Sequence, residues 1–187
     1  MTVRAGRALQ ATLLGLSILP LAACDGLIFE EFEGGFKTKF TAQSTGSDPN
    51  FKDTRTVDPN ENADVKEYRD SIVSGTVQVN WVQAKILDPL PADNSAQWGW
   101  GELYLRRTGE PDYPPNPIAS FSSVPIVANQ SYRLDFGDPA NKQHLIDLVF
   151  DNPDGKVDAY MFGGSDVVPV HFEVEIEFNL SGEVALP

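Results

Sequence analysis

The feature that most constrains the fold is a strict alternation of apolar and polar residues between His171 and Leu180. The apolar members are Phe172, Val174, Ile176, Phe178 and Leu180, and the polar members between them are His171, Glu173, Glu175, Glu177 and Asn179. Successive side chains of a strand point to opposite faces, so this pattern predicts a strand with one face in a core and the other in water. The apolar face of such a strand has to be covered by a second layer of secondary structure.

Shorter apolar segments recur along the chain, separated by turn residues and by many of the fourteen prolines. They predict further strands at residues 36–42, 76–87, 97–107, 118–127, 131–136 and 156–162. About seven strands in a chain of this length indicate a single mainly-β domain. We expect a two-sheet antiparallel β-sandwich of the Ig-like or jelly-roll kind, with one or two short helices. A β-barrel is the alternative.

Two segments favour helices and one favours a loop. Apolar residues recur at helical spacing within residues 62–73, and Gly75 is placed to terminate that helix. Asp138 followed by Pro139 is typical of a helix start and predicts a helix that reaches Phe150. Residues 44–60 are polar and rich in turn formers, and we expect a long loop there.

The N-terminal segment carries the parts of a secretory leader. Two arginines precede an uncharged run from Ala8 to Ala23 that is too short to span a bilayer. The run ends in Leu21-Ala22-Ala23-Cys24, which holds the only cysteine in the sequence. This tetrapeptide resembles the lipobox of bacterial lipoproteins. The resemblance implies cleavage after Ala23 and lipidation of Cys24, and an ordinary cleaved signal peptide is the alternative.

This resemblance also implies a domain organisation and a location. We expect residues 1–23 to be a removed leader, residues 24–34 a membrane-proximal tether and residues 35–187 a single folded domain. Several acyl chains make a durable anchor, which would hold the domain in the cell envelope, facing the periplasm. Asp25 resembles the inner-membrane retention signal of enterobacterial lipoproteins, and this favours the inner membrane over the outer membrane.

The charge balance limits the partners of the chain. Its net charge of −13 argues against nucleic acid, because binding to nucleic acid depends on neutralising phosphates with Lys and Arg. We therefore expect the membrane as one partner, reached through the lipid, and an envelope glycan or protein as the other.

The strand expected at residues 97–107 is the candidate ligand-binding element. Side chains two residues apart share a face, so a regular strand places on one side Trp98, Trp100, Glu102, Tyr104 and Arg106. Aromatic rings beside an acid and an arginine suit the stacking of sugar rings, with polar contacts to their hydroxyls, or the binding of an extended peptide. The alternative is that the tryptophans pack in the core of the sandwich.

Glu173, Glu175 and Glu177 form an acidic row, and a glycosidase needs two carboxylates that flank the scissile bond. The row is similar to the acidic strand motif of laminarinase-type glycoside hydrolases, although Glu175 stands where those enzymes carry aspartate. The resemblance implies a small glycan hydrolase that uses Glu102 with one of the three glutamates. A solvated outer face of the strand is the simpler alternative.

A second candidate site has the alternating oxygen ligands of a calcium loop, in Asp58, Asn60, Asn62 and Asp64. The EF-hand pattern fails at two positions, because Ala63 replaces glycine and Arg69 replaces the bidentate acid. A calcium-dependent adhesion module is therefore an alternative function, and a polar loop with a helix cap is the structural alternative. No other cofactor is expected, since neither His144 nor His171 has a partner visible in the sequence.

The sequence contains neither a Gly-x-Ser-x-Gly nucleophile elbow nor a thiol besides Cys24. We therefore predict a lipid-anchored envelope protein with a non-catalytic binding or assembly role. The small glycan hydrolase and the calcium-dependent adhesion module are the alternatives.

Overall fold

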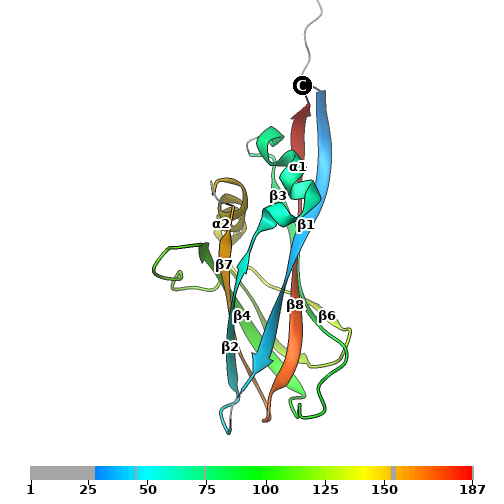
Figure 1. The fold of residues 1–187 in the computed structure, drawn as a ribbon, viewed down its shortest axis with the longest axis vertical. Helices are drawn as coiled ribbons and strands as arrows, with labels where there is room; N and C mark the ends of the chain where they lie inside the picture. Colours follow the sequence, from blue (N-terminus) through cyan, green and yellow to red (C-terminus); the bar gives the residue numbers. More distant parts are fainter. Residues whose placement is uncertain (1–27, 45, 74, 153–154, 187) are drawn as a thin grey trace, which may run out of the picture.

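The computed structural model describes residues 28–186, apart from residues 45, 74, 153 and 154. Two four-stranded antiparallel sheets pack face to face, which confirms the β-sandwich (Figure 1). The strands are β1 (Ile28–Gln43), β2 (Asn50–Val57), β3 (Gln78–Ile86), β4 (Trp98–Arg107), β5 (Ala119–Pro125), β6 (Ser131–Arg133), β7 (Val157–Ser165) and β8 (His171–Leu186). The helices are the 3-10 helices η1 (Pro59–Glu61) and η2 (Arg69–Ser71) and the α-helices α1 (Ala63–Tyr68) and α2 (Pro139–Phe150).

The order of the strands identifies the sandwich as a jelly roll. Sheet A has the order β1-β8-β3-β6, and sheet B has the order β2-β7-β4-β5. Four antiparallel pairs are nested within one another, namely β1 with β8, β2 with β7, β3 with β6 and β4 with β5. The chain is thus one long two-stranded ribbon, rolled up so that its pairs alternate between two sheets, and this is the eight-stranded jelly-roll arrangement. The β-barrel alternative is wrong, because the described strands form two separate sheets. The contact between Ser120 on β5 and Asp135, two residues after β6, is an isolated bridge and does not close them into one.

The core lies between the two sheets and confirms the alternation seen in the sequence. The five apolar side chains of β8 from Phe172 to Leu180 are at most 3% exposed. They pack against inward side chains of sheet B, among them Leu103, Leu105 and Met161. Burying one such large apolar side chain stabilises the fold by roughly 1.5–3 kcal/mol. The alternating polar residues of β8 consequently lie on the outer face of sheet A.

The β1–β8 pair is longer than the sandwich itself. Its register runs from Ile28 opposite Leu186 to Gln43 opposite His171. The end of this ribbon that holds Ile28 projects beyond the sheets, and α1 lies beside it (Figure 1). There the Phe32 ring meets the Phe150 ring edge-on, with centroids 6.5 Å apart. Because β1 runs without a break across residues 34 and 35, the part of the expected tether from Ile28 onward belongs to this ribbon.

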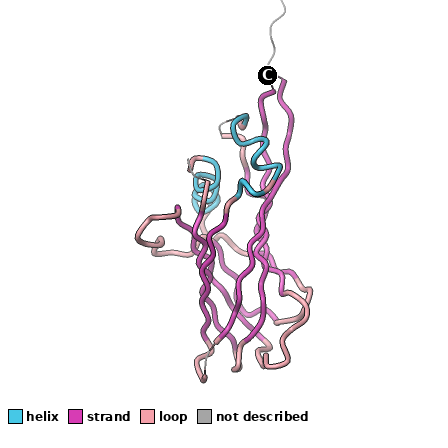
Figure 2. The backbone as a smooth tube through the Cα atoms, viewed as in Figure 1, coloured by secondary structure: helices cyan, strands magenta, loops and turns pink. Residues whose placement is uncertain are grey.

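The helices agree only in part with the prediction. α2 begins as expected, with the Asp138 side chain accepting a hydrogen bond from the Ala140 N–H at 2.8 Å and Pro139 in the first turn. The helix expected at residues 62–73 is shorter, because α1 ends at Tyr68 and the chain continues as η2. Figure 2 shows these helices gathered at one end of the sandwich, with loops at both ends.

The long loop predicted at residues 44–60 is wrong, because it contains β2. β2 is an edge strand of sheet B, and only Phe51 and Val57 on it are buried. An edge strand exposes more of its side chains than a central one, so its sequence need not alternate between apolar and polar residues.

Candidate ligand-binding face

The five residues predicted to share one face of a strand do so on β4. Leu103 and Leu105 point into the core, and the outward positions alternate with them. Of the outward residues, Trp98 is 49% exposed, and Trp100, Glu102, Tyr104 and Arg106 are half-buried. The alternative that these tryptophans pack in the core is therefore wrong.

Neighbouring elements add three aromatic rings to this surface. Tyr160 and Phe162 on β7 stand directly across from Tyr104 and Glu102. The Phe162 ring meets the Trp100 ring edge-on at 5.3 Å, and the Tyr160 ring lies 5.8 Å from that of Tyr104. Tyr113, from the proline-rich loop after β4, packs its ring 5.3 Å from Tyr160. We call the outward side chains of β4 together with Tyr113, Tyr160 and Phe162 the aromatic face.

A glycine on β7 allows the Trp100 indole to lie over the sheet. Gly164 is the cross-strand partner of Trp100, and a Cβ there would stand 2.7 Å from the indole Nε1. Real Cβ atoms essentially never come that close to another heavy atom, so the indole occupies space that only glycine leaves free. Asp166 fixes the start of the strand, because its Oδ1 accepts hydrogen bonds from the Gln97 and Trp98 N–H groups at 3.1 and 2.9 Å.

Two polar clusters lie among the rings. The Tyr104 hydroxyl donates to Glu102 Oε2 at 2.8 Å, and burial together with this bond raises the pKa of Tyr104 to about 12. Tyr104 therefore stays a neutral donor at physiological pH. In the second cluster, the Arg106 guanidinium lies 4.2 Å from the centre of the Tyr113 ring and 3.4 Å from Asp158 Oδ2.

The outer face of sheet A has the opposite character. Lys37 lies 3.5 Å from a Glu175 oxygen and 3.0 Å from a Glu177 oxygen, and Gln83 donates to Glu177 at 2.6 Å. The hydrogen bond to Glu177 raises the pKa of Lys37. For Glu177, partial burial acts to raise the pKa, but the hydrogen bonds from Lys37 and Gln83 outweigh it and the pKa is lowered. Lys37, Glu175 and Glu177 on this face are thus paired with one another.

This arrangement corrects the hydrolase alternative. Glu102 is on the outer face of sheet B, whereas Glu173, Glu175 and Glu177 are on the outer face of sheet A. Packed sheets lie about 10 Å apart, and these side chains point away from each other on opposite sides of both sheets. Glu102 therefore shares no cleft with any of the three, and the predicted carboxylate pairing is wrong.

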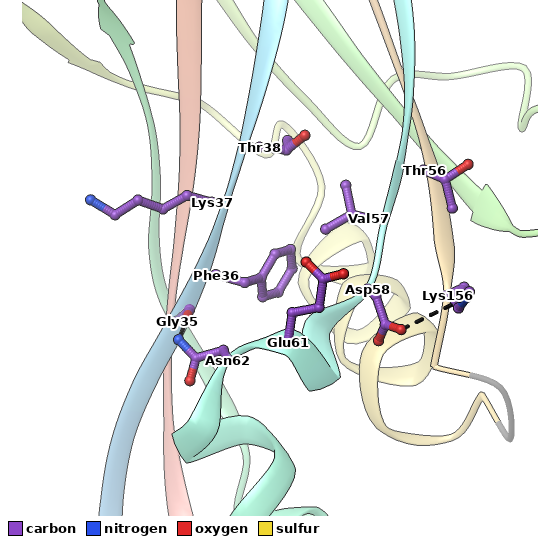
Figure 3. Close-up of a pocket in the computed structure, with 10 residues that line it drawn as sticks. All are labelled: Gly35, Phe36, Lys37, Thr38, Thr56, Val57, Asp58, Glu61, Asn62 and Lys156. Atoms are coloured by element: carbon purple, nitrogen blue, oxygen red, sulfur yellow. Dashed lines mark hydrogen bonds and ion pairs between the residues drawn. The ribbon is translucent and has the colours of Figure 1, made fainter.

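The calcium candidates run from Asp58, just before η1, into α1, and Asp58 and Asn62 line a pocket of about 490 Å³ between the edges of β1 and β2 (Figure 3). Asp58 accepts a hydrogen bond from the Asn60 N–H at 3.0 Å, and Asn60 Oδ1 accepts one from Arg69 at 2.6 Å. Asn62 Oδ1 accepts from the Val65 N–H at 3.2 Å, and its amide donates to the Gly35 carbonyl. Three of the four candidates thus carry structural hydrogen bonds, and the side chain of Asp64 lies outside the described part.

No cluster of metal-ligating side chains and no membrane-spanning helix is found in the described part of the chain. Its His, Cys, Asp and Glu residues form no group of three or more suited to hold a metal ion. None of its helices has the length and apolar character needed to cross a bilayer. His171 pairs with Asp93, with Nδ1 2.9 Å from Oδ1, and His144 is exposed on α2. Ala23 and Cys24 precede the described residues, so lipidation stays a prediction.

The aromatic face was found only in part from the sequence. Alternation on β4 predicted its five residues, but nothing in the sequence indicated that Tyr113, Tyr160 and Phe162 adjoin them. The two-residue spacing of Tyr160 and Phe162 places these two side chains on one face of the strand expected at residues 156–162, but it does not say which strand lies beside it. Their nearness to β4 depends on the pairing of β7 with β4, which is not readable from local pattern.

No family model and no curated protein matches this sequence. Among solved structures, a chain of desmodium yellow mottle tymovirus is 11% identical with a TM-score of 0.35, over 98% of each chain. A chain of turnip yellow mosaic virus is 9% identical with a TM-score of 0.31, over 83% of this chain and 96% of the other. A chain of the empty head of turnip yellow mosaic virus is 11% identical with a TM-score of 0.28, over 100% of this chain and 92% of the other. The strand order of this chain, rather than these likenesses, defines its jelly-roll fold.

Proposed function

We propose that this protein is a lipid-anchored component of the bacterial cell envelope that binds a glycan on the aromatic face, without catalysing a reaction. The β-sandwich supplies the scaffold, and the lipid on Cys24 supplies the location. Cys24 precedes the first residue of β1 by four positions, so the anchor would hold the β1–β8 ribbon close to the bilayer.

The observation that carries the proposal is the contrast between the two outer faces of the sandwich. On sheet A, lysine, glutamate and glutamine side chains pair with one another, and the tryptophan of this sheet, Trp81, is covered by the Arg133 guanidinium 4.0 Å from its ring centre. On sheet B, a run of aromatic rings occupies the corresponding positions. Partly exposed rings that are gathered on one face mark an interaction surface, because they bury their area fully only against a ligand.

The shape and polarity of the aromatic face favour a saccharide over a peptide. The outward positions from Trp98 to Tyr104 are six residues apart, which spans about 20 Å of strand. Hydrogen-bonding groups lie between the rings, in the Glu102 carboxylate and the Tyr104 hydroxyl. A sugar presents C–H groups that stack on rings and hydroxyls that bond to such polar groups, so several units of a chain fit this alternation.

Tryptophan fluorescence provides the test. The sequence has three tryptophans, and Trp81 is on sheet A, so Trp81→Phe leaves only Trp98 and Trp100 as indole fluorophores. We expect oligosaccharides released from cell-envelope polysaccharide to shift the emission of this full-length variant in mild detergent. Trp98→Ala and Trp100→Ala in the otherwise native chain should each weaken binding about tenfold by calorimetry, and Trp81→Phe should leave it unchanged.

Two outcomes would overturn this function. Saccharides that bind equally well to Trp98→Ala, Trp100→Ala and native protein would remove the aromatic face as the site. A shift of emission with extended peptides, and none with any saccharide, would make the ligand a polypeptide.

A further inference from the structure

Glu102 is placed among aromatic rings. Its neighbours on the same face of β4 are Trp100 and Tyr104, each two residues away, or about 6.7 Å along the strand. Phe162 is directly opposite it on β7, and the Phe162 and Trp100 rings are in contact at 5.3 Å. Rings thus flank this carboxylate on both sides along β4 and on the β7 side across the sheet, while Ser120 of β5 is its partner on the other side.

The negative charge of Glu102 has no cation beside it. Its described partner is the Tyr104 hydroxyl, which donates to Oε2 at 2.8 Å and remains uncharged. Within the described range, no Lys, Arg or His forms an ion pair with Glu102. Oε1 of this carboxylate has no described hydrogen-bond partner, so it can accept a bond from a ligand.

The cations nearest to this point are engaged elsewhere or set apart. Arg106 is held by Asp158 at 3.4 Å, by the Pro111 carbonyl at 2.9 Å and by the Tyr113 ring. Lys52 is in the same cross-strand row as Glu102, but it is on β2 with Phe162 between them. The protein as a whole carries a charge of −13, which repels polyanions.

We infer that the aromatic face selects a saccharide that carries a protonated amine, and that this amine binds at Glu102. The inference rests on the glycan-binding function proposed above and narrows its ligand to amino sugars. An ammonium group forms charge-assisted hydrogen bonds with a carboxylate, which are stronger than those of a neutral hydroxyl. The negative faces of the surrounding rings attract the same cation.

Three soluble oligosaccharides of equal length test the inference on the full-length Trp81→Phe protein in mild detergent. They are a glucosamine tetramer, its N-acetylated counterpart and a galacturonate tetramer, which differ in charge far more than in size. We expect the glucosamine tetramer to bind about tenfold more tightly than the N-acetylated one. The galacturonate tetramer should bind most weakly, and added salt should reduce the preference for the amine.

Glu102→Gln keeps the shape of the side chain and removes its charge. In this variant the two glucosamine-based tetramers should bind equally, while the contribution of the rings persists. Tyr104→Phe is the matched control, because it removes the hydroxyl and keeps both the ring and the Glu102 charge. It should retain the preference for the amine. A thermal melt of each variant checks that the fold is unchanged.

The results separate this inference from the proposed function. Equal binding of the glucosamine and N-acetylglucosamine tetramers by native protein, with loss of both in Trp100→Ala, would overturn amine selection and leave glycan binding intact. A preference for the amine that persists in Glu102→Gln would likewise overturn it. Failure of every saccharide to bind would instead count against the proposed function itself.

Discussion

The Trp100 indole lies over Gly164, with its Nε1 2.7 Å from the point where a Cβ on that glycine would stand. The two residues are cross-strand partners in β4 and β7. The Trp100 indole therefore fills the space that the absent side chain of Gly164 leaves on this face of the sheet. This pairing turns the Trp100 ring toward Phe162 and gives the aromatic face its continuity.

Gly164→Ala tests this relationship. The added methyl group would displace the indole, because the indole is the movable partner in that contact. We expect glycan affinity to fall roughly three- to tenfold and stability to fall by about 1 kcal/mol. Fluorescence titration in the Trp81→Phe background measures the first effect and urea unfolding the second. Ser131→Ala, at an exposed position on β6 of sheet A, is the control, and an equal loss of affinity there would contradict the prediction.

Glu177→Gln tests the charge pairing on sheet A. The folded-state pKa of Glu177 is lowered from 4.5, so the stability it contributes is present above that value and lost as pH falls through the lowered pKa. The variant should be less stable at neutral pH by up to about 1 kcal/mol, since the pair is partly exposed. Urea unfolding at a series of pH values should show this difference shrinking in acid. A stability difference between native protein and Glu177→Gln that grows toward low pH would refute a lowered pKa for Glu177.

Lys37 gives the complementary dependence at high pH. Its hydrogen bond with Glu177 raises its pKa above 10.5 in the folded state, so its contribution is complete below that value and lost as pH rises through the raised pKa. Because Lys37 is largely exposed, we expect only a small effect. Lys37→Met should narrow the stability gap between neutral and strongly alkaline solution, and an unchanged gap would argue against the pair.

Arg69 joins the η1–α1 segment to the end of α2. Its guanidinium donates to the Asn60 side chain at 2.6 Å, to the Asn152 carbonyl at 3.0 Å and to the Val149 carbonyl. Arg69→Lys should destabilise the protein by about 1.5–3 kcal/mol, because one compact ammonium cannot reach all three acceptors. Lys66→Ala, at an exposed site nearby, should change stability by less than about 0.5 kcal/mol. Equal effects of the two substitutions in urea unfolding would show that the three hydrogen bonds of the Arg69 guanidinium are not needed for stability.

Calcium should not stabilise the protein. The oxygens of Asp58, Asn60 and Asn62 already accept hydrogen bonds that cap or hold the η1–α1 segment. A ligand that binds only the folded state raises the melting temperature, so the melting curve is a direct readout. We expect the same curve in excess calcium and in chelator. A rise with calcium that is lost in Asn60→Ala would restore the calcium alternative.

Lipidation of Cys24 makes a prediction that does not depend on the domain. Cells grown with labelled palmitate should incorporate the label into the native protein and not into Cys24→Ala. Separation of the inner and outer membranes would then show where the labelled protein resides, and Asp25 leads us to expect the inner membrane. Label that persists in Cys24→Ala would place the acyl group elsewhere.

The sequence by itself determined the half-buried strands. Alternation predicted β8 and the outward residues of β4, because period-two spacing follows from backbone geometry alone. The start of α2 was equally local, since Asp138 and Pro139 act within one turn. β2 was missed because an edge strand shares little of its surface with the core, so its residues carry no such pattern.

Only the tertiary structure decided what these strands bring together. It placed Tyr160, Phe162 and Tyr113 beside β4, and it put Glu102 on the opposite outer face from the acidic row of β8. Local spacing states which side chains share a face of one strand, but not which strands pair or to which sheet each belongs. Strand pairing and sheet membership depend on how the whole chain buries its apolar surface. They bring the residues of the aromatic face together.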